Sequence, residues 1–167
     1  AITDSFMEKV AKGEDFPLIN PRTGVPVAKV SAGKIFAEIV ESAWASGEPG
    51  VIFIDRINEH NPTPALGPIE STNPCGEQPL LPYEACTLGS INLSLMLREE
   101  NGALEVDWEE LKRVTHISVR FLDNVVDASK YPIPQIEKMA KANRKIGLGV
   151  MGWAELLIKK RIPYNSE

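Results

Sequence analysis

The chain is poor in the residues that mark three common classes of protein. Two cysteines and two histidines among 167 residues do not form a disulfide scaffold, and they give no four-ligand zinc set. No apolar run reaches the roughly 18 residues that a membrane-spanning helix needs. The net charge of -5, without a large basic cluster, disfavours a nucleic-acid surface. We therefore predict no metal site, no membrane segment and no nucleic-acid partner.

The remaining composition is that of a globular protein. Hydrophobic residues make up 43% of the chain, which is enough for a core, and the length suits a single domain over residues 1–167. The first residues show no basic region followed by an apolar run, so we expect no signal peptide and a reducing, cytoplasmic location. The chain lacks an initiator methionine and stops directly after an amphipathic segment, so we expect a piece of a longer polypeptide.

Apolar periodicity and turn residues predict alternating helices and strands, which indicates an α/β fold. Helices are expected at residues 5–12, 32–46, 108–129, 133–142 and 151–160. Extended segments are expected at residues 16–20, 25–30, 51–54, 85–95 and 146–150, the fourth of which runs into a helical turn. The run at 51–54 is apolar throughout, the pattern of a strand buried on both faces of a parallel sheet.

Outside the central loop, we interpret the distinctive side chains as structural. Trp44 and Trp153 lie at helical spacing among apolar neighbours, so we expect both in the core. The basic groups at 144–145 and 159–161 are interpreted as solvated helix ends, which the helix dipole favours. Residues 147–152 have the G-x-G-x-x-G spacing of dinucleotide sites, but only Lys145 and Ile146 would remain for the strand that precedes such a site, and the chain ends fifteen residues after Gly152. Close packing of a strand and a helix is the preferred interpretation of these glycines.

Residues 61–82 are rich in proline and glycine, which predicts a long loop. Within it lies the pentapeptide Asn73-Pro74-Cys75-Gly76-Glu77. It places an amide, a thiol and a carboxylate at alternate positions, which point to one side in an extended segment. We therefore expect Asn73, Cys75 and Glu77 to converge on one small object. The second cysteine, Cys86, follows eleven positions after the first.

From the residues alone, Cys75 has several interpretations. As a metal ligand it lacks enough companions of the right kind. As the nucleophile of a hydrolase it would need a base, for which His60 lies fifteen residues upstream. As an ordinary buried thiol in a rigid loop it would need no partner, and Asn73 and Glu77 would be turn residues. The spacing by itself leaves these alternatives open.

Three stretches of the chain together resemble the ribonucleotide reductases. Residues 72–93, which contain Asn-Pro-Cys-Gly-Glu and Glu-Ala-Cys-Thr-Leu-Gly-Ser, are similar to the active-site finger loop of that family. Residues 43–55 and 143–153 resemble the segments before and after this loop. The closest resemblance is to the adenosylcobalamin-dependent class II, because the connection between the two cysteines is short. The resemblance covers essentially the whole chain, and the loop motif is long and specific.

The resemblance implies a fold and four catalytic residues. The fold would be part of the ten-stranded α/β barrel of the family, with its finger loop at about 61–82. Cys75 would carry the thiyl radical that abstracts the 3′ hydrogen of the ribose, and Glu77 would accept the proton of the 3′-hydroxyl. Asn73 would hydrogen-bond the ribose hydroxyls. Cys86 would be one member of the reducing cysteine pair, whose partner lies outside this chain. Asn73 and Glu77 would thus also bind substrate.

The resemblance also implies a cofactor and partners. Adenosylcobalamin would generate the radical in the complete enzyme, although no residue here is assigned to bind it. The substrate would be a ribonucleoside di- or triphosphate, with nucleotide effectors and a thioredoxin-type reductant, and a homodimer is compatible with the family. We expect the segment alone to be inactive. The alternatives are a class I-type reductase large subunit, whose radical-relay tyrosines would lie outside this chain, and a non-catalytic thiol-switch or interaction module.

Overall fold

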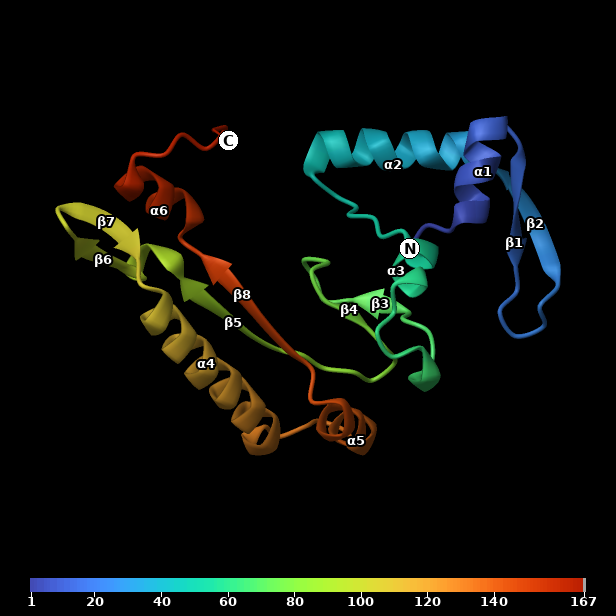
Figure 1. Cartoon of the computed structure of the whole chain (residues 1–167). Helices are drawn as coiled ribbons and strands as arrows, with labels where there is room; N and C mark the ends of the chain where they lie inside the picture. The colour runs from blue at the N-terminus through green and yellow to red at the C-terminus, as the bar shows by residue number, and fades with distance from the viewer. Residues whose placement is uncertain (167) are drawn as a thin grey trace. The chain divides into compact units, whose positions relative to one another are not determined.

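The computed structural model describes residues 1–166, which divide into two compact units between Pro82 and Tyr83 (Figure 1). In chain order the first unit contains α1 (Asp4–Lys12), β1 (Asp15–Ile19), β2 (Pro26–Ser31), α2 (Ala32–Ser46), α3 (Ile54–Glu59), the 3-10 turn η1 (Pro64–Leu66), β3 (Ser71–Thr72) and β4 (Pro79–Leu80).

The first helix begins one residue before its expected start, and the other boundaries of the first two helices are those that the sequence predicts. The Thr3 hydroxyl accepts a hydrogen bond from Phe6 N at 3.2 Å, and Gly13 ends α1 with φ +67°. Ser31 and Gly47 cap α2 in the same way. Between the helices, β1 and β2 pair as an antiparallel hairpin. The core of this unit consists of Ile2, Phe6 and Ala32, with Met7, Val10, Phe16, Ile35, Phe36 and Ile39 packed against it.

The expected buried strand at 51–54 is wrong. Only Phe53 forms a β-bridge, with Ile2, and α3 begins at the next residue. Val51 and Phe53 are 43% and 45% exposed. A run of four apolar residues does not fix a period, so it cannot distinguish a strand from the entry to a helix. The expected burial of Trp44 and Trp153 is also wrong, because these side chains are 87% and 50% exposed.

The second unit extends from Tyr83 onward and is built on a parallel pair of strands. Its elements are β5 (Thr87–Asn92), the 3-10 turn η2 (Leu93–Leu95), β6 (Leu97–Glu100), β7 (Ala103–Val106), α4 (Trp108–Ala128), α5 (Pro134–Asn143), β8 (Ile146–Met151) and α6 (Trp153–Lys160). β5 and β8 pair in register from Thr87 opposite Ile146 to Asn92 opposite Met151. The expected helices of this unit and its strand at 146–150 are confirmed.

One helix covers one face of the parallel pair. Figure 1 shows α4 running along β5 and β8. At Gly89 an added Cβ would lie 3.5 Å from the Leu122 methyl groups, in ordinary van der Waals contact with α4. Leu122 and Val126 are buried in this contact layer. Leu122 of α4 thus packs directly against β5 at Gly89.

The hairpin of β6 and β7 was not expected, although the sequence contains its signal. The strands pair from Leu97 opposite Val106 to Glu100 opposite Ala103. The connecting Asn101 and Gly102 both have positive φ, at +52° and +79°. Asn-Gly is the preferred pair for such a two-residue turn, because it tolerates positive φ at both positions.

The architecture confirms a mixture of helices and strands. Within residues 1–166, β5 and β8 are the only parallel pair of strands, so a ten-stranded barrel is not formed by these residues themselves. None of the helices in this part of the chain is long and apolar enough to span a bilayer.

Candidate active site

Cys75 lies in the loop of a short antiparallel hairpin. β3 and β4 pair Ser71 with Leu80 and Thr72 with Pro79. The thiol is exposed, and the pentapeptide around it forms the connection between the two strands. The expected long loop at 61–82 therefore contains a hairpin of its own, and the predicted reactive cysteine is in its turn.

Asn73 holds this turn closed with both its backbone and its side chain. Its carbonyl oxygen accepts from Gly76 N at 3.1 Å, and its backbone N–H donates to Gln78 O at 3.2 Å. Its side-chain Oδ1 accepts from Gln78 N at 3.0 Å. Within residues 1–166 the side-chain Nδ2 has no protein acceptor, so it stays available to a ligand.

The pentapeptide is a turn rather than an extended segment. Residues 74–75 form a hydrogen-bonded turn, residues 76–78 are bent, and Gly76 has φ +83°. Asn73, Cys75 and Glu77 therefore do not point to one side by the alternation of an extended strand. What places them together is the hairpin, because all three belong to one loop between paired strands. Proline and glycine within the motif favour this geometry.

The hairpin is attached to α3 by the side chain of Asn58, which the sequence did not identify as important. Asn58 Nδ2 donates to Ile69 O at 2.9 Å and to Ile54 O at 3.1 Å. Asn58 Oδ1 accepts from Ile69 N at 2.7 Å. The Asn58 side chain thus hydrogen-bonds both the backbone N–H and the backbone C=O of Ile69, a buried residue two positions before β3. An Asn at the end of a short helix before a proline-rich stretch is a weak signal for such an anchor.

A pocket of about 450 Å³ adjoins the hairpin within the first unit. Its wall is formed by the connection between α2 and α3 and by the hairpin, including Thr72 and Cys75. Two acidic side chains, Glu48 and Glu70, also line it. A thiol beside a polar pocket of this size can meet a ligand, which an enclosed core thiol cannot. This exposure contradicts the interpretation of Cys75 as an ordinary buried thiol.

Cys86 belongs to the second unit and is half-buried. It directly precedes β5, and its Sγ lies 3.7 Å from the carbonyl oxygen of Thr87. Thr87 N in turn donates to Lys145 O at 3.3 Å, at the start of the parallel pairing. The strand pair therefore fixes the backbone on one side of the second predicted cysteine.

A buried ion pair lies on the other side of Cys86. The side chain of Glu84 is 1% exposed, and its Oε2 lies 2.6 Å from Lys145 Nζ. Its Oε1 accepts from Asn143 Nδ2 at 2.9 Å. Glu84 has no role predicted from the sequence, and the expectation that Lys145 lies at a solvated helix end is wrong. Burial of Glu84 could not be read from its sequence position, because both of its partners are about sixty residues away.

Arg144, between these two partners, is held by α4. Its guanidinium donates to Asp123 Oδ1 at 2.7 Å and to Asp127 Oδ1 and Oδ2, both at 2.9 Å. These hydrogen bonds lower the pKa of both aspartates below the ordinary value, and they raise the pKa of Arg144. Arg144 ends α5 with φ +49°. The junction of α5 and β8 is thus fixed to α4 by a cation shared between two carboxylates.

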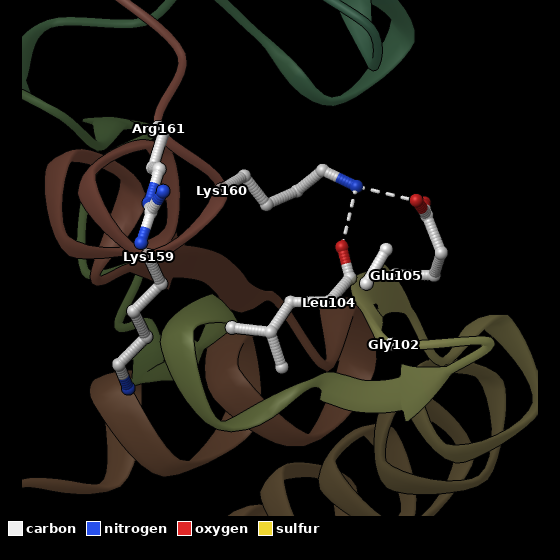
Figure 2. A pocket seen from close by; sticks show the side chains of 7 residues that line it. Gly102, Leu104, Glu105, Lys159, Lys160 and Arg161 are labelled. Atoms are coloured by element: carbon white, nitrogen blue, oxygen red, sulfur yellow. Dashed lines mark hydrogen bonds and ion pairs between the residues drawn. The ribbon is translucent and has the colours of Figure 1, made fainter.

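Two residues of the second basic group, Lys159 and Lys160, are likewise paired rather than solvated. Figure 2 shows Lys160 Nζ pointing to the β6–β7 hairpin, where it lies 2.7 Å from Glu105 Oε2 and 2.9 Å from Leu104 O. Lys159 Nζ lies 3.1 Å from Ser94 O and 3.0 Å from Glu155. The pocket of about 420 Å³ between the hairpin and the end of α6 therefore contains cations that protein groups already neutralise. Its contacts fasten the hairpin to the helix.

Comparison with known proteins gives the family. The barrel domain of ribonucleotide reductase matches residues 1–167. A vitamin B12-dependent ribonucleoside-diphosphate reductase of Mycobacterium tuberculosis is 52% identical over 166 residues, which are 99% of this chain and 23% of that protein. The protein of the same name from Thermoplasma acidophilum is 48% identical over 165 residues, 99% of this chain and 21% of that protein.

A viral protein is also similar. A Frog virus 3 protein, whose name assigns it to the large subunits of ribonucleoside-diphosphate reductases, is 36% identical over 181 residues, 99% of this chain and 30% of that protein. The chain spans less than a third of the length of each of these relatives. Since the family match extends from the first residue to the last, the chain belongs to the ribonucleotide reductases and covers part of their barrel domain.

Proposed function

We propose that the full-length protein containing this chain reduces ribonucleotides to 2′-deoxyribonucleotides by a thiyl-radical mechanism. The observation that carries the proposal is the exposed thiol of Cys75, presented in a hairpin turn that Asn73 closes, in a chain of this family. The product class follows from the relatives, which are named as ribonucleoside-diphosphate reductases. We propose a ribonucleoside diphosphate as the substrate for the same reason.

In this proposal the three polar residues of the turn divide the chemistry at the ribose. The Cys75 sulfur, as a thiyl radical, takes the 3′ hydrogen and forms an S–H bond. The Glu77 carboxylate accepts the proton of the 3′-hydroxyl, which helps the 2′-hydroxyl to leave as water. The free Nδ2 of Asn73 donates a hydrogen bond to a ribose hydroxyl while Oδ1 stays bound to Gln78.

Reduction requires a pair of thiols as well as the radical. The overall change converts a ribonucleotide and two thiols to a deoxyribonucleotide, one disulfide and one water molecule, so the thiols supply two electrons. Cys86 is one of these thiols in the proposal. Because Cys75 carries the radical and returns to a thiol at the end of the cycle, the partner of Cys86 comes from outside this chain. We expect no Cys75–Cys86 disulfide as the product of a single turnover.

We propose adenosylcobalamin as the cofactor, because the two bacterial and archaeal relatives are named as vitamin B12-dependent. When bound, this cofactor supplies the radical that oxidises the Cys75 thiol. The exposure of Cys75 fits this role, since a large cofactor cannot reach a thiol inside a closed core. The described residues assign no side chain to the corrinoid itself.

The test is an assay of the full-length protein with a ribonucleoside diphosphate and a dithiol, with and without adenosylcobalamin. We expect deoxyribonucleotide only when the cofactor is present, and none from Cys75→Ala. The matched control is Cys86→Ala, which leaves the radical-bearing thiol intact and therefore retains exchange of a 3′-tritium label into water while reduction is lost. Cofactor-dependent reduction that persists in Cys75→Ala would refute the assignment.

The second candidate is a class I-type large subunit, which receives its radical from a separate metal-containing subunit. The similarity to the Frog virus 3 protein favours it, because that relative is named as a large subunit. In the same assay this alternative predicts no reduction with adenosylcobalamin alone and reduction after a metal-containing subunit is added. The proposed roles of Cys75, Glu77 and Asn73 are the same in both cases.

A further inference from the structure

Glu84 carries a deeply buried carboxylate close to Cys86 in the sequence. Its side chain is 1% exposed, and its two oxygens have different partners, Lys145 Nζ at 2.6 Å and Asn143 Nδ2 at 2.9 Å. The proposed chemistry at the ribose does not use it. Its position in the sequence is two residues before Cys86.

The energetics of this pair favour a role in geometry. Removing a carboxylate and an ammonium from water costs several kcal/mol for each ion, and their attraction offsets this cost only when the contacts are close and complete. Replacing a buried ion pair by apolar residues of similar volume is often neutral or stabilising. The ionic contacts also fix the orientation of the Glu84 side chain, because its two oxygens meet donors from different residues, Asn143 and Lys145. A buried polar contact of this kind fixes a segment in one position.

The segment that it fixes contains Cys86. Glu84 is bound to Asn143 and Lys145, and Thr87 N donates to Lys145 O at 3.3 Å. The backbone on both sides of Cys86 is therefore tied to the same three-residue junction between α5 and β8. That junction is itself fixed, because Arg144 at its centre binds two aspartates of α4.

We propose that Glu84 is a positioning residue for the redox thiol of Cys86. Its carboxylate, held by Lys145 and Asn143, keeps the segment before β5 against the α5–β8 junction. The Cys86 thiol therefore keeps one orientation and one degree of burial. This inference rests on the proposed reductase function for its catalytic consequence. The position of the thiol itself can be measured without turnover.

The experiment compares two Glu→Gln variants of the full-length protein. Glu84→Gln removes the charge at the proposed anchor and keeps the shape of the side chain. The control, Glu105→Gln, removes the carboxylate of the Glu105–Lys160 pair, which also joins distant segments of the second unit at 2.7 Å (Figure 2). Alkylation of Cys86 by iodoacetamide is followed by mass spectrometry in the absence of substrate, and nucleotide reduction is then assayed separately.

We expect Cys86 in Glu84→Gln to react about tenfold faster than in the wild type, because the segment opens more often, and Glu105→Gln to react at the wild-type rate. We further expect kcat of Glu84→Gln to fall about tenfold at unchanged KM, with exchange of the 3′ label retained. Equal alkylation rates in all three proteins would overturn the inference. If the wild type reduces no nucleotide, the proposed function fails, but the alkylation rates still decide the role of Glu84.

A second variant covers the case in which Glu84→Gln does not fold. The double variant Glu84→Gln/Lys145→Met also removes the cation that would otherwise be left buried without its partner. We expect this protein to fold and still to show faster alkylation of Cys86 than Glu105→Gln. A folded double variant with wild-type alkylation would overturn the inference, because the anchor would then be dispensable.

Discussion

Replacing Gly152 by alanine tests how closely β8, α6 and the end of β5 fit together. Gly152 precedes α6 with φ +71°, and a Cβ added there would lie 2.1 Å from Asn92 Oδ1 and 3.3 Å from Ser94 N. Asn92 Oδ1 accepts a hydrogen bond from Ser94 N at 3.1 Å, and Ser94 is buried. The methyl group of alanine therefore forces Asn92 away and removes the acceptor from a buried N–H group.

Two terms make up the expected loss of stability. A left-handed conformation costs an L-residue about 1–2 kcal/mol, and a buried N–H without an acceptor costs about 1–3 kcal/mol. The sum is about 2–5 kcal/mol. Gly102→Ala separates the two terms, because Gly102 has φ +79° but no atom within 4 Å of the added Cβ. This control should lose only about 1–2 kcal/mol.

Hydrogen–deuterium exchange of the full-length protein measures the difference locally. We expect amides of η2 and the first turn of α6 in Gly152→Ala to exchange roughly 5- to 150-fold faster than backbone strain alone would cause, which is the effect of losing about 1–3 kcal/mol with the hydrogen bond. In Gly102→Ala the acceleration should be smaller and confined to the β6–β7 hairpin. Wild-type exchange around η2 in Gly152→Ala would refute the reasoning, because it would mean that Asn92 and Ser94 adjust at no cost.

Two further predictions concern the candidate site and the junction next to it. Asn73→Asp keeps an oxygen that accepts from Gln78 N but loses the amide donor, so we expect it to preserve the hairpin and abolish reduction, whereas Asn73→Ala should also loosen the hairpin in hydrogen exchange. The hydrogen bonds from Arg144 lower the pKa of Asp123 and Asp127, so their stabilising effect is complete above the ordinary aspartate pKa near 4 and is lost as pH falls through the lowered values. The difference in local stability between wild type and Arg144→Gln should therefore shrink as the protein is acidified from pH 7 to about pH 3, and a constant difference would contradict the assignment.

The local features of the fold could be predicted because short-range physics determines them. Thr3, Ser31 and Asp107 are side chains that cap helices, and Gly13 and Gly47 end them, so five boundaries follow from residues within one turn of each. The failures involve burial. Trp44 is apolar and helical, yet it is 87% exposed, and nothing within its own helix determines what lies against it.

In the candidate site, too, the residues of a short motif could be predicted from the sequence and the distant contacts could not. Cys75, Asn73 and Glu77 could be proposed because they form one short motif, although they share one loop of a hairpin rather than an extended segment. The anchors Asn58 and Glu84 were missed because their partners are eleven and about sixty residues away. Periodicity and spacing carry no information about contacts at that separation. The one signal in the sequence for these contacts is a polar residue shortly before a motif that has no other explanation.

The long separation between Glu84 and its partners also matters while the protein is being made. Cys86 leaves the ribosome about sixty residues before Asn143 and Lys145 do. At about 5–20 residues per second this takes roughly 3–12 s, during which neither β8 nor the anchor exists. The thiol is therefore open to oxidants and to wrong disulfides in the nascent chain for that time. A reducing environment during synthesis would keep this thiol reduced for the role proposed for it.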